Sequence, residues 1–264
     1  MRTQNHFGQN DHCGEYIFDF ADDAKMLTHC TPIFFMPSRT STPTSIPANG
    51  TVALIDTGSR KLLVTCAHVW FDFLKFRATN NDAILLVKFR YGRGPFMGIQ
   101  DAALVDCDEQ LDLAVFATDL PEDILGYKTF FKINSFPIAD PKPRQPISCV
   151  GFPGETRRVS ETKMAFGYAV FRLTVSDVST RMILLANNDL RVLRDNEGRL
   201  CSPIDVGGMS GAPAYTRTPS GGFNLSGFVR AGNTSNSDIR LSKASFIRQD
   251  GSLLRPRWHP HANV

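Results

Sequence analysis

The chain has 264 residues, of which 42% are hydrophobic and 21% charged, so it carries enough apolar material for a substantial core without disulfides or structural metals. Its formal net charge is only +3, which gives no electrostatic reason to expect nucleic acid or a membrane surface as a partner. No stretch approaches the roughly 18 consecutive apolar residues that span a bilayer, and the polar N-terminus lacks the basic start and apolar run of a secretory signal. We therefore expect a cytoplasmic protein whose six cysteines are free thiols.

From residue 31 onward, short apolar runs are separated by Gly, Pro, Asn and Asp. The runs are rich in Val, Ile, Leu and Phe, a pattern typical of strands in an all-β sandwich or barrel. Alternation with long amphipathic helices, which a Rossmann-type sheet requires, does not occur. The strands expected from these runs are Ile33–Met36, Thr51–Asp56, Lys61–Cys66, Ala83–Arg90, Ala102–Val105, Leu113–Thr118, Ile147–Phe152, Ala165–Thr174, Arg181–Ala186, Gly211–Tyr215 and Phe223–Val229.

Helical signal is limited to two short segments, Val69–Lys75 and Glu122–Leu125. The Ser/Thr/Pro-rich stretch 38–49 predicts a surface loop. The stretch 134–146, with four prolines, divides the strands into two sets and predicts an interlobe linker. We thus predict an irregular N-terminal appendage (1–30), a first β lobe (31–133), the linker (134–146), a second β lobe (147–245) and a C-terminal segment (246–264).

Three segments carry residue types suited to nucleophilic catalysis. His68 follows the apolar run of LLVTCAHV, Asp112 precedes that of LDLAVF, and Ser210 lies in the glycine-rich GGMSGAP. A neutral imidazole can take the proton of a serine hydroxyl, and a buried carboxylate can fix its tautomer and balance its charge. Five of the six histidines lie in the terminal segments, so His68 is the only candidate base in the strand-rich region.

The spacing of the three residues predicts a shared site. Asp112 follows His68 by 44 residues and Ser210 follows Asp112 by 98, which puts the first two in one lobe and the third in the other. Ligand sites often lie at such an interlobe cleft. Each residue alone is more often structural, but together they have the types, contexts and order that catalysis needs. Glycines around Ser210 would let the backbone aim the N–H groups of Gly208 and Ser210 at a developing oxyanion.

These segments resemble the signatures of the trypsin/chymotrypsin-like serine peptidases, especially bacterial members without disulfides. VTCAHV is similar to the histidine motif Thr-Ala-Ala/Gly-His, LDLAVF to Asp-Ile/Leu-Ala, and GGMSGAP to Gly-Asp/Asn-Ser-Gly-Gly-Pro. The resemblance covers roughly Ile33 to Gly232. It implies two six-stranded antiparallel β-barrels with the active site in the cleft between them, and a serine endopeptidase acting on peptide or protein substrates through His68, Asp112 and Ser210.

The chain departs from this family pattern at three positions near the proposed site, one of them a small change in which Ala212 replaces the second glycine after Ser210. Met209 replaces the Asp or Asn before the nucleophile, so the ion pair that activates many zymogens cannot form, and we expect a site formed on folding or by another contact. Arg230 stands where a small polar residue usually supports the aspartate.

The resemblance also indicates a pocket for the substrate residue before the cut. Asp205 on its wall would favour a basic residue and Arg230 an acidic one, so the preference stays open. The lining residues would be Ile204, Asp205, Val206, Gly207, Val229, Arg230, Ala231 and Gly232.

Three alternatives belong to other classes of protein. An α/β-hydrolase would place its residues in the order Ser, Asp, His and carry Gly-x-Ser-x-Gly, whereas Ala212 follows Ser210 by two here. A catalytically silent peptide-binding module on the same fold stays open, because fold does not fix function. The pairs His12-Cys13 and His29-Cys30 match no common zinc spacing, and Cys66 is expected to be a core thiol, so we expect no metal and no cofactor.

The activity of a peptidase in the cytoplasm has to be limited to its proper substrates. Narrow specificity, a regulatory protein partner or an obstructed substrate groove could provide this limit. Residues 1–30 are a candidate for that role.

Overall fold

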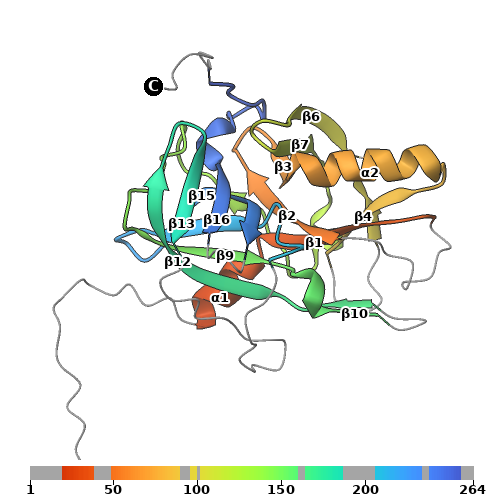
Figure 1. Ribbon diagram of the computed structural model, residues 1–264, viewed down its shortest axis with the longest axis horizontal. Helices are drawn as coiled ribbons and strands as arrows, with labels where there is room; N and C mark the ends of the chain where they lie inside the picture. Colours follow the sequence, from red (N-terminus) through yellow and green to blue (C-terminus); the bar gives the residue numbers. More distant parts are fainter. Residues whose placement is uncertain are drawn as a thin grey trace, which may run out of the picture.

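The computed structural model describes residues 20–38, 49–89, 96–99, 102–159, 164–186, 206–233 and 238–256, which fold mostly as β-strands (Figure 1). In this part of the chain the α-helices are α1 (Phe20–Leu27), α2 (Ala67–Thr79) and the short α3 (Glu122–Leu125). None of these helices is long and apolar enough to cross a membrane. The prediction of an all-β fold is confirmed at this level, as is the short helix at Glu122–Leu125.

The first half of the chain forms an eight-stranded sheet. Its order is β5-β4-β1-β2-β3-β7-β6, with antiparallel neighbours, and β8 pairs parallel to β2 beside this path. The bounds are β1 (Cys30–Met36), β2 (Asn49–Asp56), β3 (Lys61–Thr65), β4 (Ile84–Lys88), β5 (Phe96–Gly98), β6 (Ala103–Asp108), β7 (Leu113–Ala117) and β8 (Phe131–Lys132).

The second half of the chain forms a closed antiparallel barrel. Six strands follow each other around it in the order β12-β13-β16-β15-β14-β9, while β10 pairs separately with β11. The bounds are β9 (Pro146–Gly151), β10 (Arg157–Val159), β11 (Met164–Phe166), β12 (Ala169–Val178), β13 (Met182–Ala186), β14 (Pro213–Arg217), β15 (Phe223–Asn233) and β16 (Asp238–Lys243).

The predicted pair of six-stranded barrels is therefore found only in part. The second lobe is a six-stranded barrel, whereas the first lobe is a half-barrel sheet of eight strands, with no closure among the residues described. The additional strands β5 and β8 have three and two residues, too short to stand out as apolar runs in the sequence.

Both faces of the first sheet are buried. Phe34 of β1 and Val64 of β3 belong to a core shared with the barrel, whereas their neighbours Ile33 and Leu63 face a second core to which α2 contributes Phe73. Strands covered on both faces appear in the sequence as continuous apolar runs rather than as alternating patterns. This is why the central strands are predictable.

The strands of the second half of the chain differ from the prediction at β10, which was not predicted, and at two further places. The run Ala165–Thr174 is divided into β11 and β12 because the chain turns at Gly167, whose N–H donates to the carbonyl of Thr156 at 3.1 Å. Strand β16 was not predicted at all. It carries only two large apolar residues, Ile239 and Leu241, in the alternating sequence DIRLSK.

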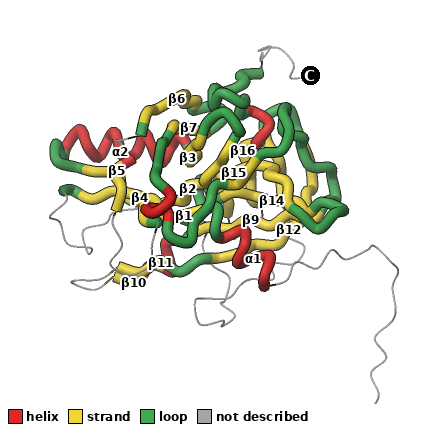
Figure 2. The backbone as a smooth tube through the Cα atoms, turned by 180° about the vertical axis from the view of Figure 1, so that it is seen from behind, coloured by secondary structure: helices red, strands yellow, loops and turns green. Residues whose placement is uncertain are grey.

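Helix α1 lies in the segment that the sequence describes as polar and irregular. It packs against β9 of the barrel, while α2 lies beside β7 of the first sheet (Figures 1 and 2). Both carboxylate oxygens of Asp23 accept from Arg172, at 2.6 and 2.7 Å, Asp22 pairs with Arg217 at 3.1 Å, and Met26 is fully buried. These partners are distant in sequence, so tertiary contacts rather than local propensity stabilise the helix.

Beyond β16, residues 244–256 leave the barrel and contact the first sheet. The guanidinium of Arg255 lies 2.6 Å from Asp106 and 2.8 Å from Asp108, both on β6. The segment buries the side chains of Phe246, Ile247 and Leu253.

Parts of the predicted segments fall outside the described residues. These are residues 1–19 of the appendage, most of the loop 38–49, and the last residues of the C-terminal segment, 257–264. The five segment boundaries stay predictions.

Candidate active site

His68 lies at the start of helix α2. Strand β3 ends at Thr65, and Cys66 precedes the helix without capping it through its side chain. The first backbone N–H groups of a helix have no acceptor within the helix. Here the backbone N–H of His68 donates to Oδ1 of Asp112 at 3.0 Å, so a carboxylate distant in sequence caps the helix and fixes its first turn.

Asp112 occupies the turn between β6 and β7. Its backbone is in the left-handed region, with φ 53°, a conformation that aspartate adopts more readily than most residues. Its N–H donates to the carbonyl of Glu109 at 3.2 Å, which closes the turn. Because the residue is only 7% exposed, its carboxylate is held inside the protein against the start of α2.

The three predicted residues form one continuous chain of hydrogen bonds. Nδ1 of His68 lies 2.9 Å from Oδ2 and 3.0 Å from Oδ1 of Asp112, and Nε2 lies 2.9 Å from Oγ of Ser210. When Nδ1 donates its proton to the carboxylate, Nε2 is left as an acceptor, which is the tautomer that a general base requires. The side chain of His68 is 43% exposed, so the hydrogen-bonded chain opens to the surface.

The loop that carries Ser210 depends on two glycines. Gly208 and Gly211 both have φ 88°, and a Cβ on them would lie 2.6 Å from the nitrogen of Gly154 and 2.2 Å from the carbonyl of Thr51, respectively. Only glycine fits such positions. The N–H of Thr51, on β2, donates to the carbonyl of Ser210 at 2.8 Å and ties the loop to the first sheet.

Two backbone donors on this loop have no acceptor. In the part of the chain that the structure describes, neither the N–H of Gly208 nor that of Ser210 donates a hydrogen bond, whereas the N–H of Met209 between them donates to Val206 at 2.9 Å. The two groups predicted to bind an oxyanion are therefore both available.

The electrostatics of the site favour an ionised acid. Burial alone would raise the pKa of Asp112, but the hydrogen bonds and charge of His68, together with the charge of Arg230, outweigh burial and lower that pKa. Burial raises the pKa of the Cys66 thiol well above its ordinary value, and the charge of Asp112 raises it further. The thiol donates to the carbonyl of Val229 at 3.1 Å and is a neutral part of the core.

The first half of the predicted specificity pocket is described only in part. Ile204 and Asp205 lie outside the described residues. Val206 is buried, and the carbonyl of Gly207 accepts from the N–H of Gly154 at 2.7 Å.

The second half of that pocket belongs to β15. Val229 is buried, and Ala231 and Gly232 continue the strand. Nε of Arg230 lies 3.9 Å from Oδ2 of Asp112. The Arg230 charge is thus beside the acid of the hydrogen-bonded chain, and this geometry gives no support to its role as a specificity charge.

Residues that support the Ser210 loop were not found by sequence reasoning. Thr51 Oγ1 donates to the carbonyl of Gly208 and accepts from the N–H of Phe152, both at 3.1 Å, and Asn49 Nδ2 donates to the carbonyl of Phe152 at 2.8 Å. A polar residue inside an apolar strand, such as Thr51, is the signal that could have revealed them, because buried polar groups need partners.

One group of side chains has the donor types of a metal site. The sulfur of Cys66, a ring nitrogen of His68 and a carboxylate oxygen of Asp112 lie within 4.8 Å of one another. All three already take part in the hydrogen bonds described above. We therefore assign no metal to them.

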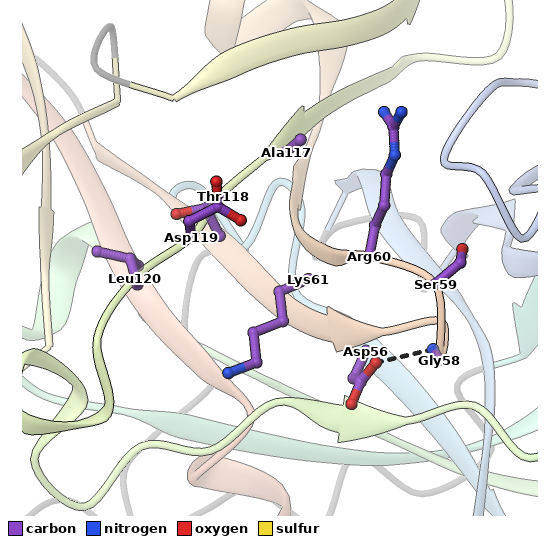
Figure 3. Close-up of a pocket in the computed structure, with 9 residues that line it drawn as sticks. All are labelled: Asp56, Gly58, Ser59, Arg60, Lys61, Ala117, Thr118, Asp119 and Leu120. Carbon is purple, nitrogen blue, oxygen red and sulfur yellow. Dashed lines mark hydrogen bonds between the residues drawn. The ribbon is translucent and has the colours of Figure 1, made fainter.

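A cavity of about 650 Å³ lies away from this site, at the β2–β3 turn and the end of β7. In Figure 3 the side chains of Arg60 and Lys61 extend in different directions, while Asp56 accepts from the N–H of Gly58. None of the three hydrogen-bonded residues lines this cavity, and its charged groups do not converge on one point.

Comparison with known proteins gives little beyond the geometry. No protein-family model and no curated protein matches the chain. Solved structures do match. One is the crystal structure of a thermostable serine protease, AL20, from an extremophilic microorganism, with 12% sequence identity, a TM-score of 0.48, and coverage of 82% of this chain and 91% of that one. A likeness this distant carries no assignment of activity, so the function has to be argued from the site itself.

Proposed function

We propose that this protein is a serine endopeptidase of the trypsin/chymotrypsin-like kind, with His68, Asp112 and Ser210 as its catalytic triad. One observation carries the proposal: a single chain of hydrogen bonds joins the carboxylate, the imidazole and the hydroxyl, with Nε2 of His68 2.9 Å from Oγ of Ser210. This is the arrangement in which a base activates a serine and is itself oriented by an acid.

The proposed reaction is acyl transfer. Oγ of Ser210 attacks the scissile carbonyl carbon while Nε2 of His68 takes the hydroxyl proton. Asp112 holds the imidazole and balances its positive charge. His68 then protonates the leaving amine, and water attacks the acyl-enzyme by the same steps, releasing the acid product and restoring Ser210.

The free N–H groups of Gly208 and Ser210 would hold the oxyanion in this scheme. Met209 supports a loop that forms on folding, because its side chain is fully buried and no ion pair is needed to place it. A Cβ on Gly151 would come within 2.9 Å of the Met209 sulfur, which shows how closely that side chain is packed. We therefore expect no activation step that depends on a newly formed N-terminus.

Strand β15 offers an edge to which a peptide substrate can bind. Its pairing with β14 ends at Phe228, while its pairing with β16 continues to Asn233. Among the described residues, no strand therefore pairs with the backbone of residues 230–233 on the β14 side. An extended peptide can add to such an edge through main-chain hydrogen bonds.

The site joins His68, on helix α2, and Asp112, in the β6–β7 turn of the first sheet, to Ser210, on the loop before barrel strand β14. This supports the chymotrypsin-like architecture of two β lobes with the active site between them. The cytoplasmic location, and the expectation that neither nucleic acid nor membrane is a partner, stay predictions from the sequence, as does a regulatory protein partner.

A fluorophosphonate probe tests the proposal. The wild-type protein should be labelled on Ser210, and the Ser210→Ala and His68→Ala variants should be neither labelled nor active on a peptide library. The library would also give the cleavage preference. Full peptidase activity in Ser210→Ala would refute the assignment, and a folded wild-type protein that is neither labelled nor active would favour the silent peptide-binding module instead.

A further inference from the structure

The residues after Ser210 lie against strand β15. The N–H of Gly211 donates to the carbonyl of Val229 at 2.7 Å, and the N–H of Val229 donates to the carbonyl of Ala212 at 2.9 Å. Under the proposed function, the edge of β15 at residues 230–233 binds the acyl segment of the substrate, which precedes the scissile bond. The leaving segment, which follows that bond, has to extend from Ser210 in the other direction, away from β15.

The part of the loop before Ser210 lies against the start of β2 and the segment before β10. The carbonyl of Gly207 accepts from the N–H of Gly154 at 2.7 Å. A Cβ on Gly208 would lie 2.6 Å from Nδ2 of Asn49, the first residue of β2. The start of β2 therefore borders the backbone that is proposed to hold the oxyanion.

The start of β2 also lies beside the helix that carries the proposed base. A Cβ on Gly50 would lie 3.2 Å from Cγ2 of Val69, in the first turn of α2, and 3.2 Å from the carbonyl oxygen of Ser210. Because His68 protonates the leaving amine in the proposed reaction, the leaving segment begins on this side of the serine. Side chains near the start of β2 are therefore placed to meet the leaving segment.

Arg157 supplies a positive charge at this place. It is the first residue of β10 and pairs with Phe166 of β11, whose side chain is buried. Nη1 of Arg157 donates to Oδ1 of Asn49 at 3.3 Å, and Nδ2 of Asn49 donates to the carbonyl of Phe152 at 2.8 Å. The guanidinium is thus held beside the residue that borders Gly208.

The guanidinium of Arg157 is available to a ligand. Within the described residues no carboxylate pairs with it, although the residue is only partly exposed. A partly buried arginine without a partner charge has lost some of its hydration and is suited to bind a carboxylate through two parallel hydrogen bonds.

We propose that Arg157 is a specificity-determining residue, which selects substrates that carry Asp or Glu among the first residues after the scissile bond. This inference rests on the proposed function. It adds a second determinant of cleavage, on the leaving side, to the pocket that the sequence indicates for the residue before the cut.

The test uses pairs of internally quenched peptides built on the sequence that the library shows to be cleaved best. Within a pair, one position after the cut carries either Asp or Asn, and successive pairs move that position along the leaving segment. Both peptide ends are blocked, so that a terminal carboxylate cannot replace the side chain. In the preferred pair, wild type should cleave the acidic peptide with a kcat/KM about tenfold higher, because charge-assisted hydrogen bonds are stronger than neutral ones.

Arg157→Gln should bring this ratio close to one, and Arg157→Glu should bring it below one, because like charges repel. The ratio does not depend on how much of a variant is folded, since both peptides meet the same protein. Arg158→Gln is the matched control. It makes the same change in net charge at the next residue of β10, which is exposed and, by the alternation of a strand, lies on the opposite face, so it should keep the wild-type ratio.

A wild type that is labelled by the fluorophosphonate but cleaves both members of every pair equally would overturn the inference. So would an undiminished ratio in Arg157→Gln, or an equal fall of the ratio in Arg158→Gln. These outcomes leave the proposed function intact. A wild type that is neither labelled nor active on any peptide would instead overturn the proposed function, and this inference with it.

Discussion

The carboxylate of Asp112 accepts from two groups of the same residue, the backbone N–H of His68 and its ring nitrogen Nδ1. The first fixes the start of helix α2 and the second fixes the imidazole. The orientation of the ring is therefore tied to the backbone of the helix and does not rest on its side-chain torsions alone. Small shifts of the β6–β7 turn should therefore change the orientation of the His68 ring.

Asp112→Asn should keep the volume of the side chain and remove its charge. The amide can hold the ring in the wrong tautomer and cannot balance an imidazolium, so kcat should fall by about 10⁴-fold. Steady-state cleavage of a peptide from the library measures this, with the exposed Asp119→Asn as a control that should leave kcat unchanged. A loss smaller than tenfold would contradict the role of Asp112.

Gly211→Ala should destabilise the protein by about 3 kcal/mol or more, because the left-handed backbone is strained and the new Cβ would lie 2.2 Å from the carbonyl of Thr51. Gly221→Ala is the matched control. It has φ 81° with nothing within 4 Å, so only the backbone strain of about 1–2 kcal/mol should remain. Urea unfolding measures the stability of both variants. Equal losses of stability would contradict the prediction, because they would show that the structure relieves the clash at Gly211.

The three residues of the proposed triad could be chosen from the sequence because their types and immediate contexts are visible in the chain, and the structure joins them by hydrogen bonds. Thr51 and Arg230 could not, since their roles come from contacts between strands that are distant in sequence. Thr51 supports the Ser210 loop across more than 150 residues, and the direction of Arg230 depends on a bulge. The position of Thr51 in an apolar strand indicates that it needs a partner but not which one, and no local pattern indicates the bulge at Arg230.

At the level of elements, helix α1 shows the limit of local patterns. It has eight residues, and its stability comes from contacts such as that of Lys128, whose ammonium donates to the carbonyl of Leu27 at 2.8 Å. The long apolar strands of the first sheet were predictable because burial on both faces leaves continuous runs. The short strands β5, β8 and β10 and the alternating β16 were not.

Lys128 should make stability depend on alkaline pH. The residue is 2% exposed, and burial lowers its pKa to about 8. Between pH 8 and the unfolded value of about 10.4, the unfolded chain binds a proton that the folded protein has released, so the free energy of unfolding rises with pH, by up to about 3 kcal/mol. Below pH 8 both states carry the proton and this contribution is constant.

Urea unfolding at pH 7, 8, 9 and 10 should therefore show wild type gaining stability relative to Lys128→Met. The difference between the two proteins isolates Lys128 from the buried thiols, whose titration acts in the opposite direction above pH 9. Lys142→Met, at an exposed position, should run parallel to wild type. If the free energy of unfolding changed with pH in the same way in Lys128→Met and in wild type, the lowered pKa of Lys128 would be contradicted.

At the scale of the whole molecule, the end of β16 and residues 244–256 connect the barrel to the first sheet. Ser242, at the end of β16, donates to the carbonyl of Leu111 at 2.6 Å, next to Asp112. Beyond it, residues 244–256 reach β6 through Arg255. The sequence predicted two lobes and a tail. It could not show that the tail returns to the first lobe, because the contacts are between single residues far apart along the chain.

A chain ending at Lys243 should lose about 3 kcal/mol or more of stability, since it no longer buries Phe246, Ile247 and Leu253. A chain ending at Pro256 keeps all three, and its unfolding midpoint is the reference for the shorter chain. Fluorophosphonate labelling should fall with the shorter chain only. Equal stability of the two truncated chains would show that residues 244–256 do not hold the sheets.

The hydrogen bond from the N–H of Thr51 to the carbonyl of Ser210 connects the first sheet to the loop before the barrel strand β14. The proposed base, His68, and the proposed nucleophile, Ser210, lie in different halves of the polypeptide, so neither half carries the complete proposed triad. If the protein were divided between residues 133 and 146 and made as two pieces, each would be inert by itself. Under the proposed function, hydrolysis by a mixture of the two pieces would therefore measure how much of the protein has reassembled.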